Sequence, residues 1–193
     1  MSSADVLPPC LYLLWPRRKR HVPDARVPVG YTLRTYHERD EQGLLNLQGS
    51  DGEPMSETEW HLYRDMLLPN GLFLVEAVSS SELVATAGAV HNPNPGRYSF
   101  PFGGELGYLI VAREHRRRGP GGAVCAAVIG RFLAAGYENI RVCVQQHRLA
   151  TVLLYLRLGL VPFLHSAEVA TRWQQVCETI GFPYTPDQWP RQL

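Results

Sequence analysis

The order of hydrophobic and polar positions along this chain predicts a series of strands and helices. Short apolar runs and residue-by-residue alternation are typical of strands, whereas apolar residues three and four positions apart are typical of helices. On the first criterion, strands are expected at residues 31–36, 72–77, 83–91, 105–111, 139–144 and 161–165. On the second, helices are expected at residues 38–48, from 56 to near 69, and at 119–136, 150–158 and 168–180.

Local signals sharpen several of these boundaries. Ser56 is followed three residues later by Glu59, a capping-box pattern that predicts the start of a helix. The polar residues 79–82 between two apolar runs predict a β-hairpin. Residues 92–104 contain Asn-Pro-Asn-Pro-Gly and Phe-Gly-Gly and are expected to form a loop. One apolar face is expected along the last helix, formed by Val169, Trp173, Val176, Cys177 and Ile180.

Length and composition indicate one globular domain with extensions. The chain has 193 residues, of which 45% are hydrophobic, and its 19 basic residues are nearly balanced by 18 acidic ones. This balance gives no bias toward nucleic acid or a membrane surface. No apolar run approaches the roughly 20 residues that cross a bilayer. The basic cluster at 17–20 follows the first apolar run, an order unlike that of a secretory signal, so a cytoplasmic protein is expected.

The four cysteines, Cys10, Cys125, Cys143 and Cys177, are scattered along the chain without C-x-x-C spacing. That distribution is typical of reduced thiols and not of a disulfide framework or a zinc site, so no metal is expected. Cys125 and Cys143 lie in apolar runs and are expected to be small core residues.

Residues 105–122 are the most informative segment, because an apolar strand there runs into a basic, glycine-rich loop and then directly into a helix. A helix N-terminus presents unpaired N–H groups and the positive end of the helix dipole, and both favour phosphate groups. Arg116, Arg117 and Arg118 add charge and forked donors. The segment therefore predicts a phosphate or pyrophosphate site, although the same residues could be a basic connection whose glycines only set a turn.

The spacing of this loop excludes two common phosphate motifs. It lacks the Gly-Lys-Ser/Thr of a Walker loop and the Gly-x-Gly-x-x-Gly that opens a dinucleotide-binding fold. What it contains is Arg-x-x-Gly-x-Gly, at Arg116, Gly119 and Gly121. A second signature follows at residues 147–162, a helical stretch that ends in Leu-Gly-Leu-Val-Pro. In these two signatures the chain resembles the GCN5-related N-acetyltransferase (GNAT) family, which uses the first to hold the pyrophosphate of acetyl-CoA.

The resemblance implies a fold and a division of the chain. The expected fold class is α/β (α+β), a mixed, mainly antiparallel sheet flanked by helices in a single domain. The family core would span residues 29–165, after a proline-rich basic extension at 1–28 and before a C-terminal helix and tail at 166–193. Family members often finish with a further strand, which the last helix replaces here. That tail could cover the sheet edge, shape the acceptor pocket or form a homodimer contact.

The resemblance also implies roles for individual residues. Those expected to bind acetyl-CoA are Leu109, Ile110, Val111, Arg116, Arg117, Arg118, Gly119, Pro120, Gly121 and Gly122. The backbone of the first three would also polarise the thioester carbonyl. Arg148 would contact a CoA phosphate or be plain surface charge, and Tyr155 would protonate the departing thiolate.

Transfer to an amine also requires a base, because an alkylamine is mostly charged at neutral pH. Glu105 is the candidate, since some family members place a base at that point of the strand; it could instead be a carboxylate that faces solvent or an arginine. Other members place a glutamate where this chain has Cys143, which is a poor base. Glu76 and His91 are weaker options.

The expected function is therefore an acetyl-CoA-dependent N-acetyltransferase that acts by direct transfer on a primary amine of a small molecule or a protein, with no nucleic-acid or membrane partner. The alternative is a sensor module that binds acyl-CoA without chemistry. Residues 37–70 and 92–104 are expected to line the acceptor pocket. Trp60, Tyr63 and Phe102 would be its aromatic walls or plain core packing.

Overall fold

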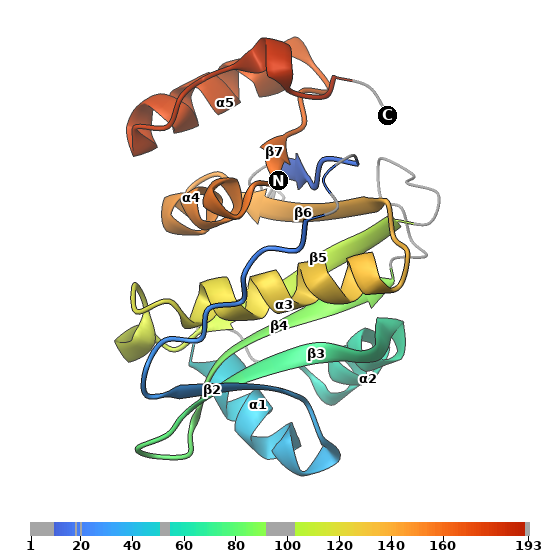
Figure 1. The fold of residues 1–193 in the computed structure, drawn as a ribbon, viewed down its shortest axis with the longest axis vertical. Helices are drawn as coiled ribbons and strands as arrows, with labels where there is room; N and C mark the ends of the chain where they lie inside the picture. The colour runs from blue at the N-terminus through green and yellow to red at the C-terminus, as the bar shows by residue number, and fades with distance from the viewer. Residues whose placement is uncertain (1–9, 18, 20, 51–54, 92–102, 192–193) are drawn as a thin grey trace, which may run out of the picture. The chain divides into compact units, whose positions relative to one another are not determined.

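The structure, a computed structural model, describes residues 10–17, 19, 21–50, 55–91 and 103–191 (Figure 1). The chain divides into two compact units. The larger unit is Arg20–Ile140, and the smaller unit combines Met1–Lys19 with Arg141–Leu193.

An antiparallel sheet forms the centre of the larger unit. Its strands lie in the order β2 (Tyr31–Thr35), β3 (Leu67–Ala77), β4 (Leu83–His91) and β5 (Gly103–Val111). The central strand β4 is buried along almost its whole length, which its small apolar side chains allow. The hairpin expected from the polar residues 79–82 is confirmed, since β3 and β4 pair on either side of that turn.

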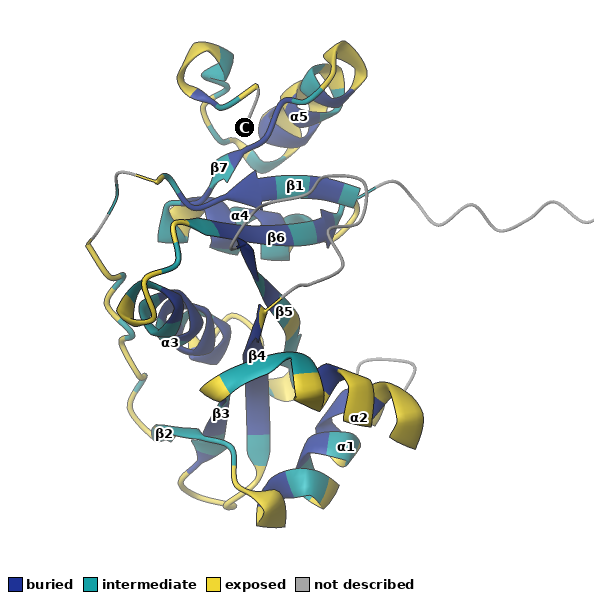
Figure 2. Ribbon diagram, turned by 90° about the vertical axis from the view of Figure 1, so that its right-hand side faces the viewer, coloured by how far each residue is buried: buried dark blue, intermediate teal, exposed yellow. Residues whose placement is uncertain are grey.

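Helices cover both faces of this sheet. Helix α3 (Pro120–Ala134) packs on β3, β4 and β5, and α1 (Glu41–Gly49) and α2 (Glu57–Met66) lie on the opposite side (Figure 2). Beneath α1 and α2 is an apolar cluster of Leu44, Trp60, Tyr63, Leu72, Leu74 and Val90. Trp60 and Tyr63 are 1% and 2% exposed, so both are core residues and not exposed walls of a pocket.

The start of α2 is confirmed and its end is corrected. Ser56 accepts from the Glu59 amide while the Glu59 carboxylate accepts from the Ser56 amide, as the capping box predicts. The helix ends at Met66, and β3 begins at once, so Pro69 and Gly71 lie inside a strand that was expected to start at Leu72. An irregular register between β3 and β4 accommodates those residues.

The smaller unit contains most of β6 (Asn139–Gln145), together with β1 (Cys10–Leu14) and β7 (Val161–Pro162). These strands are antiparallel, and β1 pairs with both of the others. β1 was not expected, because residues 1–28 were assigned as a proline-rich extension. Leu11 and Leu13 are fully buried, so the first described residues belong to the core of this unit. The strand expected at 161–165 is shorter than predicted and ends at Pro162.

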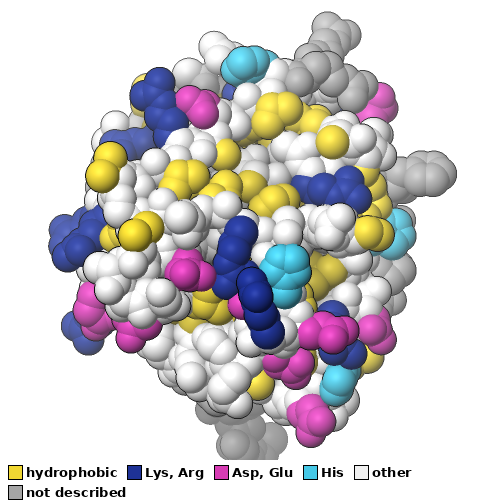
Figure 3. All heavy atoms as spheres, turned by 60° about the horizontal axis from the view of Figure 1, so that its bottom comes forward, with side chains coloured by type: hydrophobic (Ala, Val, Ile, Leu, Met, Phe, Trp, Pro, Cys, Tyr) yellow, Lys and Arg dark blue, Asp and Glu magenta, His cyan; other side chains and the backbone are white. Residues whose placement is uncertain are grey.

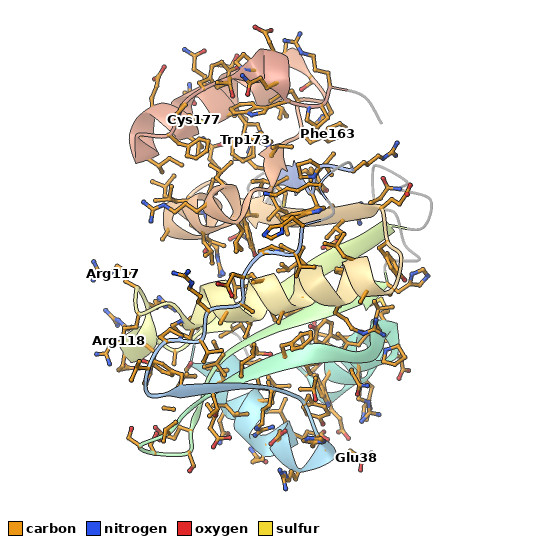
Figure 4. The ribbon with its side chains drawn as sticks, viewed as in Figure 1. Glu38, Arg117, Arg118, Phe163, Trp173 and Cys177 are labelled. Atoms are coloured by element: carbon orange, nitrogen blue, oxygen red, sulfur yellow. A yellow bond between two sulfur atoms is a disulfide. The ribbon has the colours of Figure 1, made fainter. Side chains whose placement is uncertain are left out.

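Two helices complete the smaller unit, α4 (Leu149–Leu158) and α5 (Ala167–Ile180). The amphipathic face expected on α5 is confirmed for the residues that are buried, Val169, Trp173, Val176 and Cys177. Figure 4 labels Trp173 and Cys177 on the inner side of α5, together with Phe163 after β7.

Every strand pair whose register the structure defines is antiparallel, and helices flank the strands in both units. The expected fold class, a mainly antiparallel sheet flanked by helices, is confirmed. Residues 92–102, most of the expected loop at 92–104, lie outside the described part of the chain, and Gly103 and Gly104 already belong to β5. Phe102 lies outside it as well.

Candidate active site

The connection between β5 and α3 carries the candidate phosphate site. After β5 comes a 3-10 turn, Arg113–His115, and then a short loop that leads into α3. Arg117 and Gly119 have left-handed backbone conformations, with φ angles of 60° and 100°. Glycine adopts this conformation without steric cost, whereas Arg117 does so at a cost of about 1 kcal/mol. The two left-handed residues turn the chain abruptly into the helix.

Hydrogen bonds at the base of this loop tie it to the sheet. The backbone N–H of Ala112 donates to the carbonyl oxygen of Val84 at 2.8 Å, which extends the β4–β5 pairing beyond Val111. The side chain of Arg116 folds back, and its Nε donates to the carbonyl oxygen of Val111 at 3.1 Å. The loop is therefore closed at its base by its own arginine.

The amides at the helix start are available to a ligand. Within the described part of the chain, no hydrogen bond uses the backbone N–H groups of Arg117, Arg118, Gly119 or Gly121. Pro120 has no N–H, and it occupies the first turn of α3, where that loss is harmless. The N–H of Gly122 already bonds to the carbonyl oxygen of Gly119 at 3.1 Å, so the accessible amides precede it.

Positive charge surrounds these amides. Arg116, Arg117 and Arg118 are exposed. Figure 4 shows the side chains of Arg117 and Arg118 projecting outward from the loop beside the N-terminal end of α3. The positive end of the helix dipole adds to their field. This arrangement suits a group with several negative charges.

A β-bulge lies on β5 before the loop. Thr86 of β4 pairs with Ile110 and Gly88 pairs with Gly107, so Tyr108 and Leu109 together face a single residue of β4. Tyr108 has a φ of 52°, a conformation that is costly for a bulky side chain. Leu109 therefore lies in the bulge, while Ile110 and Val111 regain regular pairing with β4.

The bulge turns an aromatic side chain outward. The Tyr108 ring packs on that of Tyr63, with 4.2 Å between the ring centroids, yet Tyr108 remains 49% exposed. Burial raises the pKa of the Tyr108 phenol, and the carboxylates of Glu59 and Glu105 raise it further. Burial also raises the pKa of Tyr63. The candidate base Glu105 is half-buried opposite Val90, within electrostatic reach of the Tyr108 hydroxyl.

The other expected site residues lie in the smaller unit. Tyr155 is on α4 and is 4% exposed. Arg148 is exposed and immediately precedes that helix, at its N-cap position. Gly159 caps the helix with a φ of 99°, as expected from its position before Leu160. Tyr155 and Arg148 thus belong to one structural element, separate from the loop residues of the larger unit.

The expectation of reduced thiols is wrong for two cysteines. Cys10 of β1 and Cys143 of β6 lie diagonally across two paired strands, since Cys10 faces Gln145 and Cys143 faces Tyr12, and they form a disulfide. Cys125 and Cys177 are free and buried, and Cys125 is the core residue that was expected. Burial raises the pKa of the Cys177 thiol to about 11 and that of Cys125 further still. Neither free thiol is therefore a nucleophile at neutral pH.

A hollow of about 670 Å³ opens in the larger unit beside α1. Arg34 and Asp40 line it and form a bidentate ion pair, with N–O distances of 2.6 and 2.8 Å. Other parts of its wall come from Glu82 in the β3–β4 turn and from Ala112 and Glu114 after β5. The end of the larger unit that carries α1 and β2 comes forward in Figure 3, where basic and acidic side chains lie close together.

Several of these features were not identified from the sequence. A tyrosine in a left-handed bulge has no sequence signature, because only its strand partner reveals the extra residue. The ion pair between Arg34, on β2, and Asp40, beyond the end of that strand, could not be predicted from the pattern of hydrophobic and polar residues either. Among the described residues no cluster of His, Cys, Asp and Glu could hold a metal ion. No described helix is both long and apolar enough to cross a membrane.

Comparison with known proteins identifies the family. The model of the acetyltransferase (GNAT) family matches residues 34–160. The chain therefore belongs to this family, and the resemblance inferred from the two signatures is confirmed. Members of this family are acyltransferases that take acetyl-CoA as the acyl donor, which agrees with the enzyme class and cofactor expected from the sequence. The matched residues extend through parts of both units.

Solved structures with the same fold have diverged far in sequence. A GCN5-related N-acetyltransferase from Sphaerobacter thermophilus is 20% identical with a TM-score of 0.64, over 80% of this chain and 49% of that one. The ribosomal-protein-S18-alanine N-acetyltransferase from Escherichia coli is 18% identical with a TM-score of 0.54, over 67% and 76%. Glucosamine-6-phosphate N-acetyltransferase from Arabidopsis thaliana is 15% identical with a TM-score of 0.53, over 67% and 90%.

These similarities show the fold, but they do not identify the acceptor substrate. The match spans about half the length of the Sphaerobacter structure and of a Drosophila protein, at 49% and 48%. No curated protein matches the chain by sequence.

Proposed function

We propose that this chain transfers an acetyl group from acetyl-CoA directly to a primary amine. The observation that carries the proposal is the start of α3, where the amides of Arg117, Arg118, Gly119 and Gly121 have no hydrogen-bond acceptor in the described part of the chain. Buried or partly buried amides are normally paired, so a group of accessible ones at a helix start is suited to an anion.

This geometry supports the following roles for residues of the larger unit in holding the donor. The pyrophosphate would accept hydrogen bonds from the loop amides, with charge from Arg116 to Arg118. The pantetheine arm would lie along Leu109, Ile110 and Val111, whose polar backbone atoms provide partners in the manner of an added strand. Near the bulge, backbone N–H groups would polarise the thioester carbonyl.

The reaction requires two proton movements. As the amine nitrogen bonds to the carbonyl carbon, it loses a proton, which we assign to the carboxylate of Glu105. As the carbon–sulfur bond breaks, the sulfur gains a proton, which we assign to the hydroxyl of Tyr155. Arg148, exposed at the start of α4, would contact a phosphate of the donor.

The acceptor amine would approach the thioester near the bulge at Tyr108, on the same strand as the candidate base Glu105. The hollow beside α1 lies toward the other end of β5, because its wall includes Ala112 and Glu114. The amine that loses its proton to Glu105 is therefore not placed in that hollow. Among the relatives named above, one acts on a ribosomal protein and another on glucosamine 6-phosphate. A protein amine and an amino sugar are therefore the first acceptors to test.

The experiment has two parts. Isothermal calorimetry with acetyl-CoA measures binding, and release of free CoA in the presence of an amine panel measures transfer. We expect wild-type protein to bind and to release CoA with at least one amine, and Gly121→Leu to lose binding while it remains folded. Gly49→Leu, at the exposed end of α1, is the matched control and should bind normally.

Each result has a clear meaning. Binding without CoA release for any amine would replace the enzyme with the alternative, a sensor of acyl-CoA. Unchanged binding by Gly121→Leu would show that the loop does not hold the donor.

A further inference from the structure

Residues 21–29 run along the outside of α3 toward the phosphate loop, as Figures 1 and 2 show in two views. We call this segment the strap. Near its start, Val22 lies over Gly130 of α3, so closely that a Cβ at Gly130 would be 3.0 Å from Val22 Cγ1. Near its end, Pro28 lies over Gly119, where a Cβ would be 2.9 Å from Pro28 Cγ. The glycines thus allow close contact at both ends of the strap.

The end of the strap is anchored to the sheet and to the loop at once. The carbonyl oxygen of Pro28 accepts from the amide of Tyr31 at 3.2 Å, in a turn that contains Gly30 with a φ of 88°. The carbonyl oxygen of Gly30 accepts from Val78 at 2.9 Å. The Tyr31 hydroxyl and the Nδ1 of His115 share a hydrogen bond of 2.8 Å. Pro28 is therefore held between β2 and the turn that opens the phosphate loop.

Beyond the hydrogen bonds at its base, the loop is largely exposed. Arg113, Glu114 and residues 116–119 are exposed, and Arg117 is in a costly left-handed conformation. Such conformations persist only where neighbouring structure enforces them. The ring of Pro28 supplies a rigid surface against Gly119, because its own φ is fixed by the pyrrolidine ring. The strap is the neighbour best placed to keep the amides of the loop aligned.

We infer that the strap positions the phosphate loop, and that Pro28 sets the affinity of the site for the diphosphate of the donor. This inference rests on the proposed function. Pro28 is a positioning residue, since it acts through Gly119 and not on the ligand. Loss of its ring would leave the loop amides intact but no longer aligned before binding, so part of the binding free energy would be spent on ordering them.

The test replaces Pro28 with alanine and measures acetyl-CoA binding by calorimetry. We expect the dissociation constant to rise about fivefold to tenfold, while turnover at saturating acetyl-CoA stays at the wild-type value. Trypsin should also cleave after Arg117 and Arg118 faster in the variant than in wild-type protein. Pro23→Ala is the same change within the strap and should leave both measurements as they are.

A second variant displaces the strap through a substitution in α3 instead of in the strap itself. In Gly130→Gln the new side chain occupies the position of Val22, on a helix residue remote in sequence from the loop. It should weaken acetyl-CoA binding and accelerate cleavage of the loop in the same way. A melting curve for each variant verifies that the protein is folded.

The outcomes separate the inference from the proposed function. If wild-type protein does not bind acetyl-CoA, the proposed function fails. If wild-type protein binds, and folded Pro28→Ala and Gly130→Gln bind equally well with unchanged cleavage, the inference is overturned and the proposed function stands.

Discussion

Arg116 donates from Nε to the carbonyl oxygen of Val111 over 3.1 Å, which joins the beginning of the phosphate loop to the last residue of β5. The same side chain thus contributes charge near the expected pyrophosphate and fixes the chain that presents the amides. A forked guanidinium can do both, because it has several donors in one plane.

We expect Arg116→Ala to raise the dissociation constant of acetyl-CoA about tenfold, because both the charge and the loop closure are lost. Arg116→Lys should fall between alanine and wild type, since it keeps the charge but loses the Nε donor. Calorimetry measures both. Arg113→Ala, an exposed arginine of the preceding turn, is the control. Equal affinities of the Arg116→Lys and wild-type proteins for acetyl-CoA would show that the hydrogen bond from Arg116 to Val111 does not contribute to binding.

Tyr155 is buried on α4, so bulk water has little access to its side chain. If it protonates the leaving thiolate, Tyr155→Phe should lower the rate of transfer about a hundredfold or more and leave acetyl-CoA affinity nearly unchanged. Single-turnover rates and calorimetry separate the two effects. Tyr184→Phe removes a hydroxyl that bonds to the Ala170 carbonyl and should not change the rate. A wild-type rate for Tyr155→Phe would show that Tyr155 does not protonate the leaving thiolate.

If the carboxylate of Glu105 takes the proton of the amine, its replacement by an amide should slow transfer. Glu105→Gln should lower the rate at neutral pH about a hundredfold and leave acetyl-CoA affinity nearly unchanged. The measurement is the single-turnover rate with one fixed amine. Glu168→Gln, exposed on α5, is the control. A wild-type rate for Glu105→Gln would show that Glu105 is not the base.

The ion pair of Arg34 and Asp40 predicts a pH dependence of stability. The hydrogen bonds from Arg34 and from the His37 amide lower the pKa of Asp40 in the folded protein. A carboxyl with a lowered pKa stabilises the fold above its unfolded pKa, about 3.9, and the stabilisation disappears as the pH falls further.

Asp40→Asn should therefore reduce the free energy of unfolding by about 2 kcal/mol at pH 7, and the difference from wild type should shrink below about pH 4. Urea unfolding at several pH values measures it. Asp24→Asn breaks an exposed ion pair with Arg26 and should have almost no effect. A difference that stays constant down to pH 2 would contradict the explanation.

The disulfide of Cys10 and Cys143 predicts a thiol count. In denaturant without reductant, two of the four cysteines should react with a thiol reagent, and all four should react after reduction. The closed loop spans a sequence separation of 133 residues, so reduction should also lower the melting temperature. Cys10→Ser without reductant should leave three reactive thiols. Four reactive thiols in the unreduced wild-type protein would contradict the pairing.

Local pattern determined much of this protein. The capping box at Ser56 and Glu59, the hairpin around 79–82 and the glycine loop before α3 all follow from residues close in sequence. These features form because of hydrogen bonds between residues a few positions apart, or because of φ angles that only glycine adopts at no cost. The family signatures belong to the same class, because the residues of each signature lie close together in the sequence.

Other features depend on contacts between residues far apart in the chain, and only the tertiary structure decided them. A run such as 10–14 becomes a strand when β6 and β7 supply its partners. Cys143 becomes half of a disulfide when the β1–β6 pairing brings Cys10 close to it, diagonally across the two strands. The bulge at Tyr108 exists only in register with β4, and Pro28 reaches Gly119 only because the strap follows α3. No periodicity in the sequence records such pairings, since their energy comes from surfaces that meet after folding.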